Sequence, residues 1–233
     1  MSAAAMRLLI FDLDGTLVDS QDMIVELQRR TFLAHGLTPP DRRTSLSVVG
    51  LSLREAFTQL VGADGPADAM AETYKSLFQE LRADSSHAEP FFPGAQETVA
   101  RYGADAGYLL GVATGKSRRG VRHLFSRTGW HDLFATVQTA DDHPSKPAPD
   151  MIHAALAETG VAAMNAFMIG DTSYDMAMAK AAGVRAIGVD WGYHEPSALI
   201  AAGADAIISD FAELESLLEA PVPSPRRAGS GLG

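Results

Sequence analysis

Short apolar runs alternate with longer amphipathic stretches along most of this chain. The apolar runs are bounded by Gly, Asp, Asn or Pro, which is typical of buried parallel strands. The predicted strands are Leu8 to Asp12, Tyr108 to Thr114, Phe134 to Thr139, Ala166 to Gly170, Ala186 to Val189 and Ala206 to Ile208. From Phe91 onward, helical periodicity lies between them at about 95–104, 117–128, 149–159, 174–182, 195–202 and 211–219. This alternation predicts an α/β fold, a doubly wound, Rossmann-like parallel sheet.

Residues 19–90 interrupt the alternation with helical periodicity and no convincing strand. Apolar positions fall on one helical face in two stretches, 53–61 and 70–81, as in amphipathic helices. The pattern predicts a small helical domain inserted into the first crossover of the sheet. The end of the chain is rich in proline and glycine, which is typical of disorder. We therefore expect a catalytic core at 1–18 and 91–219, a helical cap at 19–90 and a disordered tail at 220–233.

Composition narrows the class of protein. The 233 residues are 46% hydrophobic and 21% charged, as in ordinary globular domains. No apolar run approaches the roughly 20 residues that a membrane-spanning helix needs, and the first residues lack the pattern of a signal peptide. The absence of cysteine excludes disulfides, thiolate metal sites and a cysteine nucleophile. We expect a cytoplasmic protein without a membrane partner.

The net charge of −10 argues against nucleic acid as the main partner, because such proteins usually carry a basic face. An acidic protein that binds phosphate needs local positive charge. Lysine is scarce here, with only Lys75, Lys116, Lys146 and Lys180 in the whole chain. Two of these, Lys116 and Lys146, lie in predicted loops at the carboxyl side of the sheet.

Two carboxylates, Asp12 and Asp14, follow the first predicted strand in the segment Phe11 to Thr16. Residues two apart on a strand point to the same face, and ligands of open α/β sheets bind at the carboxyl ends of strands. Asp and Gly also favour plain turns. However, Asp-x-Asp-Gly-Thr should arise by chance in roughly one chain per thousand of this length. Motif and placement together favour a functional site.

A second acidic pair, Asp171 and Asp175, follows the predicted strand Ala166 to Gly170. We expect Asp171 to cap the turn, and Asp175 to lie one helical turn further on the same side. One such carboxylate would be an ordinary helix cap, but two acidic pairs at strand ends indicate a hard cation. Because Mg²⁺ prefers oxygen ligands, with water and phosphate completing its shell, the sequence predicts a magnesium site.

Three further residues are candidates for binding phosphate: Thr114, Gly115 and Lys146. Thr114 ends a predicted strand and Gly115 precedes a helix, so a hydroxyl, an approachable backbone and a helix amino end come together. Lys146 lies in a loop stiffened by prolines. Lys116 is a weaker candidate, since most loop lysines are simply solvated.

Taken in order, Asp12-x-Asp14, Thr114, Lys146 and Asp171 with Asp175 match the four signature motifs of the haloacid dehalogenase superfamily. The resemblance extends from residue 7 to about 219, and the predicted helical insertion resembles the superfamily's C1 cap. Phosphoglycolate phosphatase-like hydrolases look similar in three further segments, Phe11 to Ser20, Lys146 to Asp150 and Gly188 to Tyr193.

This resemblance implies a magnesium-dependent phosphatase that acts on a small phosphorylated metabolite. Asp12 would attack phosphorus and form an aspartyl-phosphate. Asp14 would protonate the leaving oxygen and later activate water. Thr114 and Lys146 would hold the transferring oxygens.

The resemblance also implies a ligand set for the cation: Asp12, the backbone carbonyl of Asp14, and Asp171. Asp175 would either join them or orient Lys146 or a metal-bound water. The cation would let an anionic nucleophile approach an anionic phosphate. Together with Lys146 it would supply the positive charge that an acidic protein needs.

Several alternatives remain beside the phosphatase. Dehalogenases of this superfamily lack an aspartate at the position of Asp14, which this chain keeps. A phosphomutase of the same fold, similar to β-phosphoglucomutase, needs a cap that excludes water and holds a sugar phosphate. A phosphonate hydrolase needs a cap lysine, and Lys75 lies on the polar side of its predicted helix. A non-catalytic phospho-accepting or binding module would be about half as long, or would have lost an acidic residue.

Substrate specificity would lie in the cap, where the candidates are Gly50, Leu51, Ser52 and Arg54. Arg54 is the obvious handle for an anion there. An ester like 2-phosphoglycolate, a sugar phosphate and a nucleotide monophosphate are all compatible with the sequence, as are a monomer and a homodimer.

Overall fold

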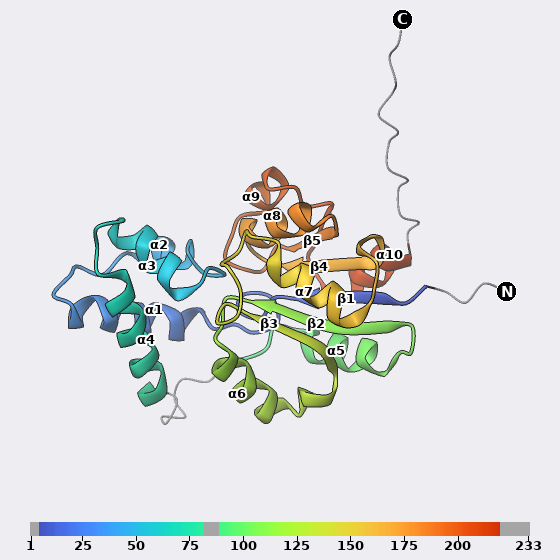
Figure 1. Ribbon diagram of the computed structural model, residues 1–233, viewed down its shortest axis with the longest axis horizontal. Coiled ribbons are helices and arrows are strands. Elements are labelled where there is room, and N and C mark those ends of the chain that lie inside the picture. Colours follow the sequence, from blue (N-terminus) through green and yellow to red (C-terminus); the bar gives the residue numbers. More distant parts are fainter. Residues whose placement is uncertain (1–4, 82–88, 220–233) are drawn as a thin grey trace, which may run out of the picture.

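The computed structural model describes residues 5–81 and 89–219. Figure 1 shows a helical body formed by α1 to α4 beside a larger body built around a sheet. The tail at 220–233, for which we expect disorder, lies outside the described residues. None of the described helices is long and apolar enough to cross a membrane.

The sheet has six parallel strands in the order β3-β2-β1-β4-β5-β6. Their bounds are β1 Arg7–Phe11, β2 Tyr108–Thr114, β3 Phe134–Thr139, β4 Ala166–Gly170, β5 Arg185–Val189 and β6 Ala206–Ile208. The predicted strands are confirmed, with ends that differ by at most one residue. The order reverses between β1 and β4, so the connections at the carboxyl ends of these strands diverge. A crevice at such a reversal is where ligands bind in open α/β sheets.

Helices cover both faces of this sheet (Figure 1). They are α5 Ala95–Ala104, α6 Arg118–Thr128, α7 Asp150–Thr159, α8 Ser173–Ala182, α9 Pro196–Ala201 and α10 Leu214–Glu219, with 3-10 turns at Trp130–Asp132, Ala163–Asn165 and Phe211–Glu213. Along β1, Leu9 and Phe11 belong to one apolar cluster, and Leu8 and Ile10 belong to another. Successive residues of a strand point to opposite faces, so β1 is buried on both sides. This explains why it appears in the sequence as an unbroken apolar run.

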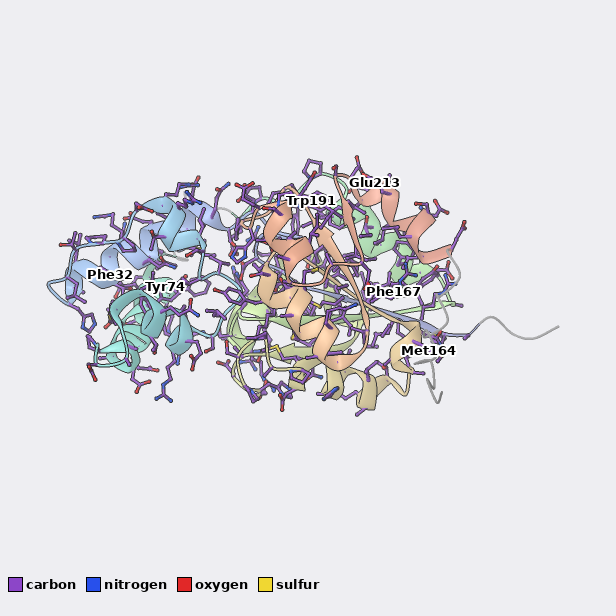
Figure 2. The ribbon with its side chains drawn as sticks, turned by 90° about the horizontal axis from the view of Figure 1, so that it is seen from above. Phe32, Tyr74, Met164, Phe167, Trp191 and Glu213 are labelled. Carbon is purple, nitrogen blue, oxygen red and sulfur yellow. The ribbon has the colours of Figure 1, made fainter. Side chains whose placement is uncertain are left out.

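Between β1 and β2 the chain forms α1 Gln21–Ala34, α2 Arg42–Leu46, α3 Leu53–Val61 and α4 Ala67–Leu81. These helices have an apolar centre of their own, in which Phe57 contacts Phe32 and Tyr74 with ring centroids 6.3 and 5.9 Å apart. Figure 2 shows Phe32 and Tyr74 in this body, away from Phe167 and Trp191 of the sheet body. We refer to α1 to α4 and the loops between them as the cap. The exact division of the chain at residues 18 and 91 stays a prediction.

Hydrogen bonds hold the cap over the sheet, both along the connecting segments and from the cap loops. The two connecting segments pair with each other, since Asp19 N donates to Pro90 O at 2.8 Å and Phe92 N donates to Leu17 O at 3.1 Å. The cap loop before α3 also contacts the sheet body, because Ser52 N donates to the Ser145 hydroxyl at 2.8 Å. The cap therefore lies above the carboxyl ends of the central strands.

Candidate active site

Three candidate residues lie at the carboxyl ends of three adjacent strands. Asp12 follows β1, Thr114 ends β2 and Asp171 follows β4, and β1 pairs with both of the other strands. Each of the three side chains is buried. Parallel strands end at the same edge of a sheet, so residues 57 to 159 positions apart in sequence meet in one place.

Lys146 joins this group from the loop before α7. Its Nζ lies 3.0 Å from Asp12 Oδ2 and donates to Asp175 Oδ1 at 2.7 Å, and all three side chains are buried. Burial alone would lower the pKa of Lys146, but the two carboxylates outweigh it and raise that pKa above its ordinary value. Lys146 is thus a permanent positive charge at the end of β1.

Asp175 is fixed by a reciprocal cap at the start of α8. Its Oδ2 accepts from Thr172 N at 3.0 Å and from the Thr172 hydroxyl at 2.7 Å, and the same hydroxyl accepts from Asp175 N. The expectation that Asp171 caps this turn is wrong, because Thr172 is the residue at the N-cap. Asp171 instead accepts hydrogen bonds from the Thr16 hydroxyl at 3.0 Å and from Tyr193 N at 2.9 Å.

Asp12, Asp171 and Asp175 form a compact acidic cluster. One carboxylate oxygen from each lies within 4.8 Å of the others, and all three are buried. Asp12 Oδ2 has the Lys146 ammonium group 3.0 Å away as an ion-pair partner, but it makes no well-aligned hydrogen bond in the described structure. Burial raises the pKa of Asp12 to about 7, although Lys146 opposes the shift. Burial and the neighbouring carboxylates raise the pKa of Asp171 well above its usual value. A divalent cation with oxygen ligands would offset this repulsion, so the residues fit Mg²⁺.

The side chain of Asp14 points into a different set of contacts. Its Oδ1 accepts from the Ser20 hydroxyl and from Lys116 Nζ, each at 2.7 Å. Lys116 also donates to Glu89 Oε1 at 2.9 Å. Asp14 is not a member of the acidic cluster, which agrees with a metal contact through its backbone carbonyl alone.

Sequence reasoning underrated Lys116 and missed Ser20 and Glu89 as parts of this site. Lys116 follows Thr114 and Gly115 directly, so its place after a central strand was a usable signal. Ser20 lies six residues after Asp14, inside the segment that carries the family resemblance. Glu89 gives no local signal, because its partner lies 27 residues further along the chain.

The cap loop closes over Gly115. A Cβ atom on this glycine would lie 2.6 Å from Leu51 O and 2.7 Å from Gly50 O, so only glycine allows the two backbones to approach this closely. Gly50 and Leu51 line a cavity of about 310 Å³ that also reaches Asp12 and Asp14. Of the predicted cap residues, these two are brought to the core site.

Ser52 and Arg54 lie further out. The Ser52 hydroxyl accepts from Glu55 N and caps α3. Arg54 is exposed and pairs with Asp68 at 3.1 Å. Both residues line an adjoining hollow of about 320 Å³, which shares Leu53, Lys75, Gly115, Ser117 and Asp141 with the cavity above Asp12. The structure does not bring Arg54 to the cavity above Asp12.

Residues 9–189 match the model of the haloacid dehalogenase-like hydrolase family. The chain belongs to this family. It is 36% identical over 212 residues to a probable phosphatase, IndB, of Dickeya dadantii, covering 89% of this chain and 91% of that one. It is 34% identical over 233 residues to a phosphoglycolate phosphatase of Rhodospirillum rubrum, covering 96% and 95%.

Solved structures of the family share the fold. A haloacid dehalogenase-like hydrolase from Streptococcus pneumoniae aligns with a TM-score of 0.79 at 26% identity, over 92% of this chain and 99% of that one. A putative β-phosphoglucomutase from Bacteroides vulgatus aligns with a TM-score of 0.75 at 21% identity, over 94% and 93%, so the fold alone does not separate phosphatase from mutase. These matches confirm the predicted superfamily and its phosphoglycolate phosphatase-like subgroup. They also confirm the predicted fold class and the predicted enzyme class, which is phosphoric monoester hydrolase.

Proposed function

We propose that this family member is a magnesium-dependent phosphatase that hydrolyses a small phosphate monoester through an aspartyl-phosphate on Asp12. The observation that carries the proposal is the placement of Asp12 and Asp14 in one cavity, with Lys146 Nζ 3.0 Å from Asp12 Oδ2. A carboxylate nucleophile, a second carboxyl group for proton transfer and a fixed cation are the groups that a two-step phosphoryl transfer needs.

The first step would transfer the phosphoryl group to the protein. A carboxylate oxygen of Asp12 attacks phosphorus, the bond from phosphorus to the leaving oxygen breaks, and Asp14 gives that oxygen a proton. In the second step water attacks phosphorus, Asp14 takes its proton, and inorganic phosphate leaves with Asp12 restored. Lys146 would balance charge on the transferring oxygens throughout, and the Thr114 hydroxyl would bind one of them.

A bound Mg²⁺ would lower the repulsion between nucleophile and phosphate. Asp12 and Asp171 would hold it with the Asp14 backbone carbonyl. Asp175 fits a positioning role, because its carboxylate is already taken up by Lys146 and Thr172.

The relatives support a small ester such as 2-phosphoglycolate as the reference substrate, and we place the enzyme in the cytoplasm. The phosphomutase alternative is less well supported. A mutase would have to bind a second phosphate or a sugar in the cap, and Arg54, the candidate for such an anion, pairs with Asp68 and does not line the cavity above Asp12.

Phosphate release from a panel of small esters, with Mg²⁺ and with a chelator, tests this proposal. We expect release that needs Mg²⁺ and that Asp12→Asn abolishes. Asp132→Asn is the matched control, because Asp132 is an exposed carboxylate just before the amino end of β3, at the opposite edge of the sheet. Release that survives Asp12→Asn, or that never occurs with any ester, would sink the mechanism.

A further inference from the structure

The cavity above Asp12 and Asp14 is apolar on its cap side. Its cap lining includes Met23, Ile24, Val49, Leu51, Phe57 and Phe78. Met23, Val49, Leu51 and Phe57 are buried among the cap helices. Because the phosphoryl group must lie at Asp12, this lining faces the alcohol that leaves.

Of the described residues that line the cavity, Lys75, Lys116 and Arg119 carry positive charge, and each is either paired with a carboxylate or exposed. Lys116 is neutralised by two carboxylates, Asp14 and Glu89, at 2.7 and 2.9 Å. Lys75 is 46% exposed and pairs with Glu72. Arg119 is also exposed. A carboxylate or second phosphate on the leaving group would therefore meet apolar side chains without a free buried cation among the described lining residues.

One polar atom on the cap side has no partner. Gln28, on α1, is 5% exposed and lines the cavity. Its Nε2 donates to Ser45 O at 3.2 Å, and its Oε1 makes no hydrogen bond in the described structure. The orientation of the amide is fixed, because a carbonyl oxygen only accepts and so must face the NH₂ group. Gln28 Oε1 is thus a buried acceptor without a partner, and a turn of the side chain toward the cavity would let a ligand donor satisfy it.

The size of the cavity is informative as well. An apolar cavity of about 150 Å³ holds a benzene molecule, and this one measures about 310 Å³. It has room for a ring or a branched chain beside the phosphoryl group. The two-carbon alcohol of a 2-phosphoglycolate-like ester would leave much of it unfilled.

We infer that the substrate is a phosphate monoester of an uncharged, largely apolar alcohol, with a ring or branched body and a hydrogen-bond donor that meets Gln28 Oε1. This inference rests on the proposed phosphatase function and narrows its substrate class. The hydrolysis is the two-step transfer through Asp12 and Asp14 given above, in which the apolar alcohol is the group that leaves with the proton.

The first test compares primary alkyl esters, whose leaving oxygens are chemically alike. We expect kcat/KM for benzyl phosphate to exceed that for ethyl phosphate and for 2-phosphoglycolate by about tenfold to a hundredfold, the gain from burying a ring. Turnover of 2-phosphoglycolate or ethyl phosphate as fast as benzyl phosphate would overturn the inference while leaving the phosphatase proposal intact. Failure to release phosphate from any of the esters would instead overturn the phosphatase proposal.

The second test isolates Gln28. Gln28→Met keeps the length of the side chain and removes the acceptor. It should lower kcat/KM for a ring-hydroxylated benzyl phosphate by about tenfold more than it lowers kcat/KM for benzyl phosphate itself. Leu33→Ala, on the same helix and 54% exposed, is the control and should alter neither. An equal loss for both esters would refute the contact.

A reciprocal variant covers the case in which Gln28→Met does not fold. Leu53 lines the cavity and is partly exposed, so lysine is tolerated there at lower cost than in the buried lining. Leu53→Lys adds a further cation to the cap side of the cavity. The ratio of kcat/KM for 2-phosphoglycolate to that for benzyl phosphate should then rise tenfold or more. An unchanged ratio would contradict the inference that the absence of a free buried cation among the described lining residues sets the substrate class.

Discussion

Lys116 Nζ lies 2.7 Å from Asp14 Oδ1, so a lysine after β2 is paired with the proposed acid and base after β1. The same ammonium group binds Glu89, which lies in the segment returning from the cap. Burial alone would lower the pKa of Lys116, but the two carboxylates outweigh it and raise that pKa. The position of Asp14 therefore depends on residues from two loops of the core and from the cap connection.

Replacing Lys116 with methionine should destabilise the protein by about 3–5 kcal/mol, because two nearly buried carboxylates lose their shared cation. Activity should fall as well, since Asp14 loses a contact that positions it. Urea unfolding and kcat measure the two effects. Lys180→Met is the control: Lys180 pairs with Asp205 at an exposed site and should cost at most about 1 kcal/mol. Equal losses in the two variants would rule out a special role for Lys116.

The stability of the metal-free protein should fall as pH rises from about 4 to 7. The ordinary pKa of an aspartate is 3.8, and burial raises that of Asp12 to about 7. In this range the folded state holds a proton that the unfolded state has released, so rising pH favours unfolding. Urea midpoints at pH 4.5 and 7.5 in chelator measure this. The urea midpoint of Asp12→Asn should fall less between these two pH values. A fall as large as that of the wild type would contradict the assignment of the pH dependence to Asp12.

Replacing Asp171 and replacing Asp175 with asparagine should have different effects on thermal stability and on its response to Mg²⁺. Asp171→Asn should lose most of the rise in Tm that Mg²⁺ produces, because it removes a proposed ligand. Asp175→Asn should destabilise the protein even without Mg²⁺, by roughly 3 kcal/mol, because it removes the carboxylate that binds buried Lys146. Thermal unfolding with and without Mg²⁺ distinguishes the two. An equal Mg²⁺ response in Asp171→Asn and wild type would exclude Asp171 as a ligand.

Gly115→Ala should raise KM and lower kcat/KM by about tenfold or more while the protein still folds. The added methyl group would lie 2.6 Å from Leu51 O, so the cap loop must move away from the strand ends, and small misplacements at an active site are costly. Gly129→Ala is the control, because its Cβ meets nothing within 4 Å. It should cost about 1 kcal/mol of stability for its positive φ without affecting kinetics. Similar kinetics in the two variants would refute the role of the close approach.

Much of the fold could be predicted from the sequence because the sheet is buried on both faces. Its strands therefore appear as uninterrupted apolar runs, and the residue after each run marks the functional edge. Asp12, Thr114 and Asp171 were found in this way. The capping of α8 was predicted wrongly, since Asp171 and Thr172 are both good cap residues. Only the hydrogen bonds of Asp171 to Thr16 and Tyr193, from other parts of the chain, decide between them.

The sequence by itself determined which strands exist, where the acidic pairs Asp12 with Asp14 and Asp171 with Asp175 fall, and that a helical segment interrupts the first crossover. These features depend on local periodicity and on short motifs. Only the tertiary structure decided that Lys116 pairs with Asp14 and Glu89, that Arg54 does not line the cavity above Asp12, and that the buried Gln28 Oε1 makes no hydrogen bond among the described residues. Such contacts join residues that are far apart in the chain. They depend on how the cap packs against the core, and no local sequence pattern encodes that packing.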